Sequence, residues 1–234
     1  MQFDGNLIHI QNARNFDYSS ETEFAPKYYN TTFDISKLTR AWLIIEPFGD
    51  RDGPAHTMLS FDFSDGQNVA VSTEIRKEVG ESFDAIKGLL RQYEIVYMIG
   101  DERDLIRLRS NYRLDTVTMY PLKIQPENLP KFFVSVMQRA QKLSEEPEWY
   151  NTITNTCATA IQDHANFVLD EKRKISWSKN ILLPKYSDEI AYNLGLIDTK
   201  LSLEEARKYY TINERAMAAN KDPDFSKKIR PEIR

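Results

Sequence analysis

The sequence predicts an α+β fold, with antiparallel strands in the first half of the chain and helices in the second. Three observations carry this prediction. Residues 56–63 and 68–76 alternate between apolar and polar side chains around an Asp-Gly turn, which is a strong hairpin signal. After Pro126 the apolar side chains change to helical spacing over residues 129–143. Good capping residues precede two further helical stretches.

Short apolar runs predict the other strands, at residues 7–10, 41–45, 94–99 and 116–122. A loop at residues 49–54 leads into the hairpin. Residues 101–109 alternate acids and arginines, which predicts a short helix or a charged turn. We expect the ion pairs of this segment to lie on a solvated surface, where they contribute little.

Within the hairpin, side chains two residues apart share a face. One face is apolar, and the other presents His56, Ser72, Glu74 and Arg76. The short turn brings His56 opposite Glu74 or Ile75, and only one of these registers sets the imidazole beside the carboxylate. There Glu74 would fix the tautomer of His56 and stabilise its protonated form. The alternative is an ordinary solvated sheet face without a catalytic role.

The first helix covers about four turns and ends before the break at residues 147–151. A second begins at Thr156 or Cys157 and runs to about Asp170. A capping box at residues 202–205 opens a third. We expect the charged, proline-containing tail from Asn220 onward to be loosely held.

The chain's 234 residues fit one unit, with a main domain over residues 1–175 and a helical C-terminal extension over residues 176–234. A net charge of −4 with interspersed signs argues against a nucleic-acid partner. No apolar run approaches the length of a membrane span, and the start of the chain lacks the features of a secretory signal. A single cysteine excludes an intramolecular disulfide.

That cysteine, Cys157, falls in the first turn of the second helix, after the capping candidates Asn155 and Thr156. Unpaired backbone N–H groups at this position stabilise a thiolate and can hold a developing oxyanion. The alternative is a buried cysteine that fills the core. His164 lies two turns along the same helix, too far to be its base, and His9 has no polar neighbourhood. His56 is therefore the candidate base.

Closely spaced metal ligands and a glycine-rich phosphate loop are both missing, so no metal or cofactor is expected.

Four segments, in order, resemble signatures of the Lnb-type extracytoplasmic domain family, named after the lipoprotein intramolecular transacylase of some Gram-positive bacteria. The resemblance extends over about residues 8–165. The four segments are residues 55–61, 72–78, 100–109 and 149–157.

The resemblance implies a permuted papain-like fold in the bacterial periplasm or another extracytoplasmic space. It also implies a thioester on Cys157, proton transfer by His56 and Glu74 as the orienting group. In the transacylase, an acyl chain moves from the diacylglyceryl group of a lipoprotein to its N-terminal amine. The family reads Asn-Asn-Cys-Thr-Thr around the cysteine, whereas this chain has Asn155-Thr156-Cys157-Ala158-Thr159. This departure leaves the oxyanion geometry and the substrate open.

Three functions follow as hypotheses. The first is a thiol acyltransferase acting on a lipoprotein or another acylated envelope substrate, in association with a membrane surface. The second is a papain-like cysteine hydrolase or amidase that cuts envelope peptides, and the third is a binding domain without catalysis. Acyl transfer needs an apolar groove beside Cys157, which we expect Trp149, Tyr150 and Met58 to line. The candidate substrate-binding or oxyanion residues are Asn155, Ser72, Arg76 and Trp149.

Overall fold

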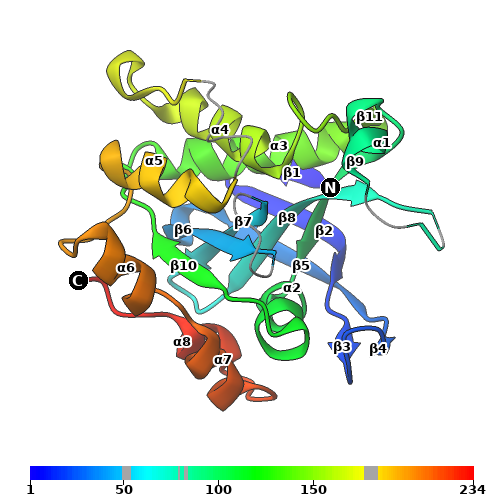
Figure 1. Cartoon of the computed structure of the whole chain (residues 1–234), viewed down its shortest axis with the longest axis horizontal. Helices are drawn as coiled ribbons and strands as arrows, with labels where there is room; N and C mark the ends of the chain where they lie inside the picture. Colours follow the sequence, from blue (N-terminus) through cyan, green and yellow to red (C-terminus); the bar gives the residue numbers. More distant parts are fainter. Residues whose placement is uncertain (49–53, 79, 82–83, 177–183) are drawn as a thin grey trace.

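A computed structural model describes residues 1–48, 54–78, 80–81, 84–176 and 184–234, and it confirms the α+β prediction. In this part of the chain nine strands form one sheet, largely antiparallel, with helices on both faces (Figure 1). Its central order is β1-β2-β9-β8-β7-β6-β10, while β5 pairs with β2 and β11 with β9. The predicted loop at residues 49–54 lies outside the described residues except for Pro54.

The sheet strands are β1 (Gln2–Asp4), β2 (Leu7–Arg14), β5 (Tyr28–Asp34), β6 (Leu38–Pro47), β7 (Ala55–Phe63), β8 (Asn68–Arg76), β9 (Glu94–Gly100), β10 (Thr118–Pro121) and β11 (Glu148–Trp149). A separate small hairpin joins β3 (Asp17–Tyr18) to β4 (Phe24–Ala25). The α-helices are α1 (Ala85–Leu89), α2 (Glu102–Arg107), α3 (Leu129–Glu145), α4 (Cys157–Val168), α5 (Ser187–Asn193), α6 (Leu203–Tyr209), α7 (Asn213–Ala219) and α8 (Phe225–Ile229). A π-helical turn, Leu108–Arg113, continues α2, and short 3-10 turns occupy Ile35–Lys37, Glu171–Arg173 and Pro184–Tyr186.

The predicted hairpin is the centre of the sheet. β7 and β8 pair antiparallel from Met58↔Ser72 to Asp62↔Asn68. Gly66 in the connecting turn has a φ of +86°, which glycine adopts without strain. On its other side β7 pairs with β6 up to Pro47↔Ala55. Both neighbours of β7 are therefore fixed in register at the end of the strand that carries His56.

Helices α3 and α4 cover one face of the sheet (Figure 1). The odd-numbered apolar residues of β7 and β8 face them, and an aromatic cluster of Phe33, Phe61, Phe63 and Phe133 fills the layer between. Aromatic side chains bury a large apolar area each. The packing of α4 on β7 brings the start of the helix to the end of the strand.

The opposite face is also covered, here by α2, α7 and α8 (Figure 1). Met58 and Ala70, which alternate with the polar residues of the hairpin, pack in this second core with Phe225 and Ile229. The expectation of a loosely held tail is therefore wrong, because the apolar side chains of the tail are needed to cover this face. Arg230 then forms ion pairs with Asp62 and Glu102.

The expectation of a solvated charge cluster at residues 101–109 is also wrong, because the C-terminal helices cover this segment. Glu102, Asp104, Arg107 and Arg109 are all buried between the sheet and the C-terminal helices. Buried charges require partners, and each of them has one. Asp104 accepts two hydrogen bonds from Arg14 and one from the backbone N–H of Phe16.

Candidate active site

His56 stands near the open end of the hairpin, as the second residue of β7. It lies opposite Glu46 of β6. On the β8 side, the register that pairs Met58 with Ser72 continues toward Glu74. This is the register, of the two that the sequence allows, that sets the imidazole beside the carboxylate. The side chain of His56 is buried, with 7% of the residue exposed.

Glu74 and Ser72 hold one nitrogen of this imidazole. Nε2 of His56 lies 2.6 Å from Oγ of Ser72 and 3.2 Å from Oε1 of Glu74. The Ser72 hydroxyl donates to the same Glu74 oxygen at 2.7 Å. A carboxylate in this place fixes the orientation of the ring and stabilises its protonated form. Ser72 therefore links the base, His56, to the carboxylate of Glu74. The contact of Ser72 with substrate, which we expected from the sequence, stays a prediction.

A buried arginine, Arg109, completes this group, and it was not among the site residues predicted from the sequence. Arg109 donates from Nη2 to Oε1 of Glu74 and from Nε to Oε2 of Glu46, both at 2.6 Å. Its third contact is to the carbonyl oxygen of Leu105. Arg109 thus holds the two carboxylates that flank His56. The sequence signal for such a group was Glu46, an acid directly after the apolar run of residues 41–45.

Cys157 is the first residue of α4, which Thr156 caps. The Thr156 side chain accepts a hydrogen bond from the N–H of Thr159, whose hydroxyl accepts from the N–H of Thr156. This reciprocal capping fixes where the helix begins. Cys157 is partly exposed, so it is not sealed in the core as the alternative interpretation required.

The sulfur of Cys157 lies close enough to the imidazole of His56 for each group to shift the pKa of the other. Because Nε2 faces Ser72 and Glu74, Nδ1 is the nitrogen left for the sulfur. Three side chains from β7, β8 and α4 thus lie together, as thiol, imidazole and carboxylate. Geometry of this kind, with a third group orienting the base, is what activation of a cysteine nucleophile requires.

The electrostatics favour the ion pair of thiolate and imidazolium. Burial alone would lower the pKa of His56, but the charge of Glu74 and hydrogen bonds to Cys157 and Glu74 raise it to about 10. Burial alone would raise the pKa of Cys157, but the hydrogen bond and charge of His56 bring it below its usual value. For Glu74 the effect of burial is overcome by His56 and Arg109, which hold its pKa well below the ordinary value. The thiolate is the reactive form of cysteine, and a lowered pKa increases the fraction of thiolate at a given pH.

The remaining predicted site residues are Asn155, Trp149 and Arg76, and each has a different environment. Asn155 donates from its side chain to the carbonyl oxygen of Trp149, and so shapes the loop before Cys157. Trp149 itself is 57% exposed. Arg76 lies further along β8 and pairs with Glu94 on the surface. The roles of these residues in substrate binding stay predictions.

The residues that we expected to line the groove lie in different parts of the structure. Tyr150 lies close enough to Cys157 for a thiolate there to raise its pKa, in addition to the larger effect of burial. Met58 instead belongs to the core on the opposite face, so its assignment to the groove is wrong. His164 hydrogen-bonds Tyr97 and Ser135 inside the molecule, as expected for a core histidine.

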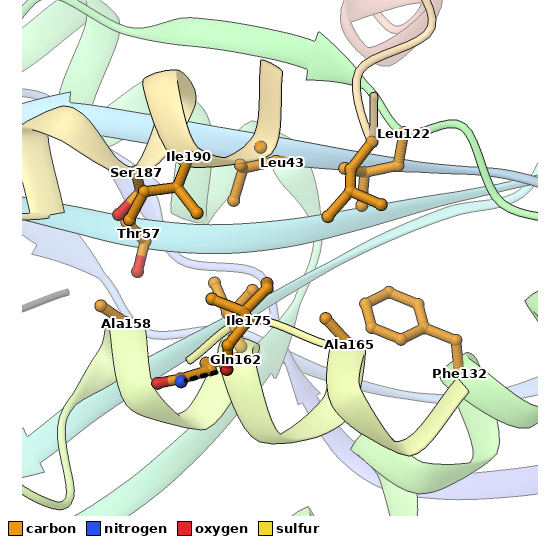
Figure 2. A pocket seen from close by; sticks show the side chains of 13 residues that line it. Leu43, Thr57, Leu122, Phe132, Ala158, Gln162, Ala165, Ile175, Ser187 and Ile190 are labelled. Atoms are coloured by element: carbon orange, nitrogen blue, oxygen red, sulfur yellow. Dashed lines mark hydrogen bonds between the residues drawn. The ribbon is translucent and has the colours of Figure 1, made fainter. Parts of the chain in front are cut away.

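An apolar cavity lies beside the site. Its walls include Thr57 and Ala158, which directly follow His56 and Cys157 in the chain. Figure 2 shows Thr57, Ala158 and Ser187 at one end of this cavity and Ala165 and Phe132 at the other. Apolar walls next to a reactive sulfur can hold an apolar substituent of the group that the sulfur attacks.

Comparison with known proteins places the chain in a family. The family model described as the Lnb N-terminal periplasmic domain matches residues 24–184. No curated protein and no solved structure matches the chain significantly. Within the described residues, no helix is both long and apolar enough to span a bilayer. The match covers more than half of the chain and confirms both the resemblance and the extracytoplasmic location, so the chain belongs to the Lnb N-terminal periplasmic domain family.

Proposed function

We propose that this domain catalyses cysteine-dependent acyl transfer at the cell envelope, with Cys157 as nucleophile, His56 as base and Glu74 as the orienting carboxylate. The observation that supports the proposal most strongly is that these three groups lie together, with the partly exposed residue Cys157 at a helix start. The envelope role of the family agrees with it. A domain that only binds would have no need of a lowered thiol pKa.

The reaction begins from the ion pair, in which His56 already holds the proton of the Cys157 thiol. The thiolate attacks the carbonyl carbon of an ester donor, and the carbonyl oxygen gains the negative charge. Backbone N–H groups in the first turn of α4 hold this oxyanion. The C–O bond to the alcohol then breaks as His56 returns its proton to the leaving oxygen, which produces a thioester on Cys157.

The second half of the reaction transfers the acyl group to an amine. The amine nitrogen attacks the thioester, its proton passes to His56, and the C–S bond breaks to release an amide. The sulfur leaves as the thiolate and re-forms its pair with the imidazolium. The donor and acceptor that the family resemblance suggests are the ester and the N-terminal amine of a lipoprotein. Hydrolysis is the second candidate function, because the partial exposure of Cys157 admits water as an acceptor.

Intact-protein mass spectrometry tests the proposal. The parent protein and the variants Cys157→Ala, His56→Ala and His9→Ala are mixed with p-nitrophenyl acetate. We expect one acetyl adduct on Cys157 and none in Cys157→Ala. His56→Ala should slow the labelling by about 100-fold or more, the contribution of a general base. His9→Ala is the matched control, since His9 is bonded to Thr32 on another strand pair, and it should label like the parent.

An amine acceptor distinguishes transfer from hydrolysis. A peptide whose N-terminal cysteine carries a diacylglyceryl group is added as both donor and acceptor, and the products are separated by mass. Acyl transfer gives the N-acylated peptide, whereas hydrolysis gives free fatty acid. Equal labelling of the parent and Cys157→Ala by the activated ester would contradict both functions.

A further inference from the structure

A polar pocket lies beside α2, on the face of the sheet that α4 does not cover. It is called the α2 pocket below, and its elements, β3, α2 and the segment after α7, lie on the side of the molecule remote from α4 (Figure 1). Its volume is about 260 Å³, compared with the roughly 15 Å³ that holds one water molecule. The pocket therefore has room for a small ligand. Its lining residues are Asn15, Asp17, Lys27, Arg103, Arg107 and Lys221.

The lining of the α2 pocket is strongly basic. Among the described residues that border it, four carry a positive charge and one, Asp17, carries a negative charge. Arg103 also pairs with Asp101 outside the pocket, which still leaves two positive charges in excess. The chain as a whole has a net charge of −4, so the sign of the charge is reversed here. A concave surface with one sign of charge concentrates ligands of the opposite sign.

Arg107 is the buried cation of the pocket. Its side chain is 7% exposed, and within the described residues it donates two hydrogen bonds. Both measure 3.1 Å, one to the carbonyl oxygen of Asn220 and one to the carboxylate of Asp17. A guanidinium has five N–H groups, and here Nε is buried without a partner. Since buried polar groups of native proteins are normally satisfied, this side chain has donors left for a further acceptor.

Lys27 and Lys221 are the exposed cations of the pocket. The side chain of Lys27 is 59% exposed and lies 3.6 Å from Asp17, and exposed pairs of this kind contribute little to stability. Lys221 is also exposed, and it forms no ion pair with any residue that the structure describes. Both ammonium groups can therefore turn to an anion in the pocket without the loss of a strong interaction.

We propose that the α2 pocket binds a phosphate group, carried by a soluble phosphomonoester or by a lipid headgroup. Its cations come from three separate segments of the chain, at residues 27, 103–107 and 221. The oxygens of a phosphate are arranged tetrahedrally and accept from several directions, whereas a carboxylate has two oxygens in one plane and fits a single arginine fork. Arg107 provides the buried donor, and the two lysines neutralise the charge. No described residue of this pocket belongs to the site around Cys157, so the proposal stands independently of the proposed function.

An NMR titration of the isotope-labelled, full-length protein tests binding. The titrants are inorganic phosphate and glycerol phosphate, with acetate as the carboxylate, at constant pH and ionic strength. Both phosphates should give saturable shifts of the backbone amide signals of residues 15–17 and 103–107, and acetate should not. The double variant of Lys27→Gln and Lys221→Gln should weaken phosphate binding by about tenfold. The matched control is Lys208→Gln, which removes an exposed lysine paired with Glu204 on α6 and should bind like the parent.

A third substitution tests the buried donor. Arg107→Lys keeps the positive charge and removes the planar fork of donors. We expect it to weaken phosphate binding by about tenfold as well, because a lysine does not replace hydrogen bonds made by a guanidinium. Thermal melting checks that this variant is folded. The lysine variants are at exposed positions, so they decide the question even if Arg107→Lys does not fold.

Vesicles distinguish the two sources of the phosphate group. The protein is sedimented with vesicles of phosphatidylcholine alone and of phosphatidylcholine with phosphatidic acid. Sedimentation that needs phosphatidic acid and falls in the lysine double variant assigns the site to a lipid headgroup. Saturable binding of glycerol phosphate without such sedimentation assigns it to a soluble phosphomonoester. Three results would refute the proposal: neither form of phosphate binds, acetate binds as tightly as phosphate, or the lysine double variant binds phosphate as tightly as Lys208→Gln.

Discussion

The charge of Glu74 should control the protonation of His56. We change Glu74 to Gln, which keeps the size of the side chain and removes its charge. At the observed 3.2 Å between Oε1 and Nε2, two unit charges interact by about 5 kcal/mol at an effective dielectric constant of 20. Arg109 lies 2.6 Å from the same oxygen and offsets part of this attraction. We therefore expect the pKa of His56 to fall by about 1 to 3 units, the usual range for a close carboxylate.

The sign follows from the competing effects on His56. In the parent its pKa is raised to about 10, because Glu74 and the hydrogen bond to Cys157 outweigh a burial effect that acts in the opposite direction. Without the Glu74 charge, less opposes the effect of burial, so the pKa of His56 falls and the imidazole loses its proton at a lower pH. Below the new pKa both proteins carry the imidazolium, and above about pH 10 neither does, so the difference is confined to the interval between.

The assay is an NMR titration of imidazole signals, because the chain has only three histidines. His164 is an internal reference, since burial lowers its pKa to about 4 and Glu74 is not among the causes. The matched control variant is Glu94→Gln, which removes a carboxylate that pairs with Arg76 on the surface. An unchanged His56 midpoint in Glu74→Gln, or an equal fall in Glu94→Gln, would refute this account of the electrostatics.

Two further predictions concern stability, and both are measured by urea unfolding. Arg109→Met leaves two carboxylates without their buried partner, so the free energy of unfolding should fall by about 3 to 5 kcal/mol. The control is the surface change Arg76→Met, which should lower it by no more than about 1 kcal/mol. Equal losses in the two variants would contradict the role given to burial. Phe225→Ala removes a fully buried side chain of the tail and should cost about 3 to 5 kcal/mol. The control is Met217→Ala, at a half-exposed position. If Phe225→Ala lowers the free energy of unfolding no more than Met217→Ala does, α8 is not part of the core.

Local sequence patterns predicted the parts of the fold that local interactions determine. The alternation on both sides of the Asp-Gly turn gave the hairpin and limited His56 to two registers. Capping residues located the start of the helix at Thr156 or Cys157, and the structure begins it at Cys157. These features depend on neighbouring residues along the chain, so one sequence is enough to predict them.

What the sequence did not predict depends on contacts between distant residues. Arg109 and Glu46 are 63 residues apart, and nothing near either of them along the chain indicates that they meet. The charges at residues 101–109 were expected in solvent because the covering helices come more than a hundred residues later. The residues that line the apolar cavity beside Cys157 were not predicted for the same reason, since α5 provides one of its walls.

One consequence concerns the difference between the recognisable stretch and the folding unit. The family match ends at residue 184, yet Arg230 provides the cation for both Asp62 on β7 and Glu102 on α2. A fragment trimmed to the matched boundaries would retain Cys157, His56 and Glu74 but leave those two acids without a counter-charge and one side of the sheet open to water. Recombinant work on this protein should therefore keep its last helix, even when only the chemistry at the thiol is of interest.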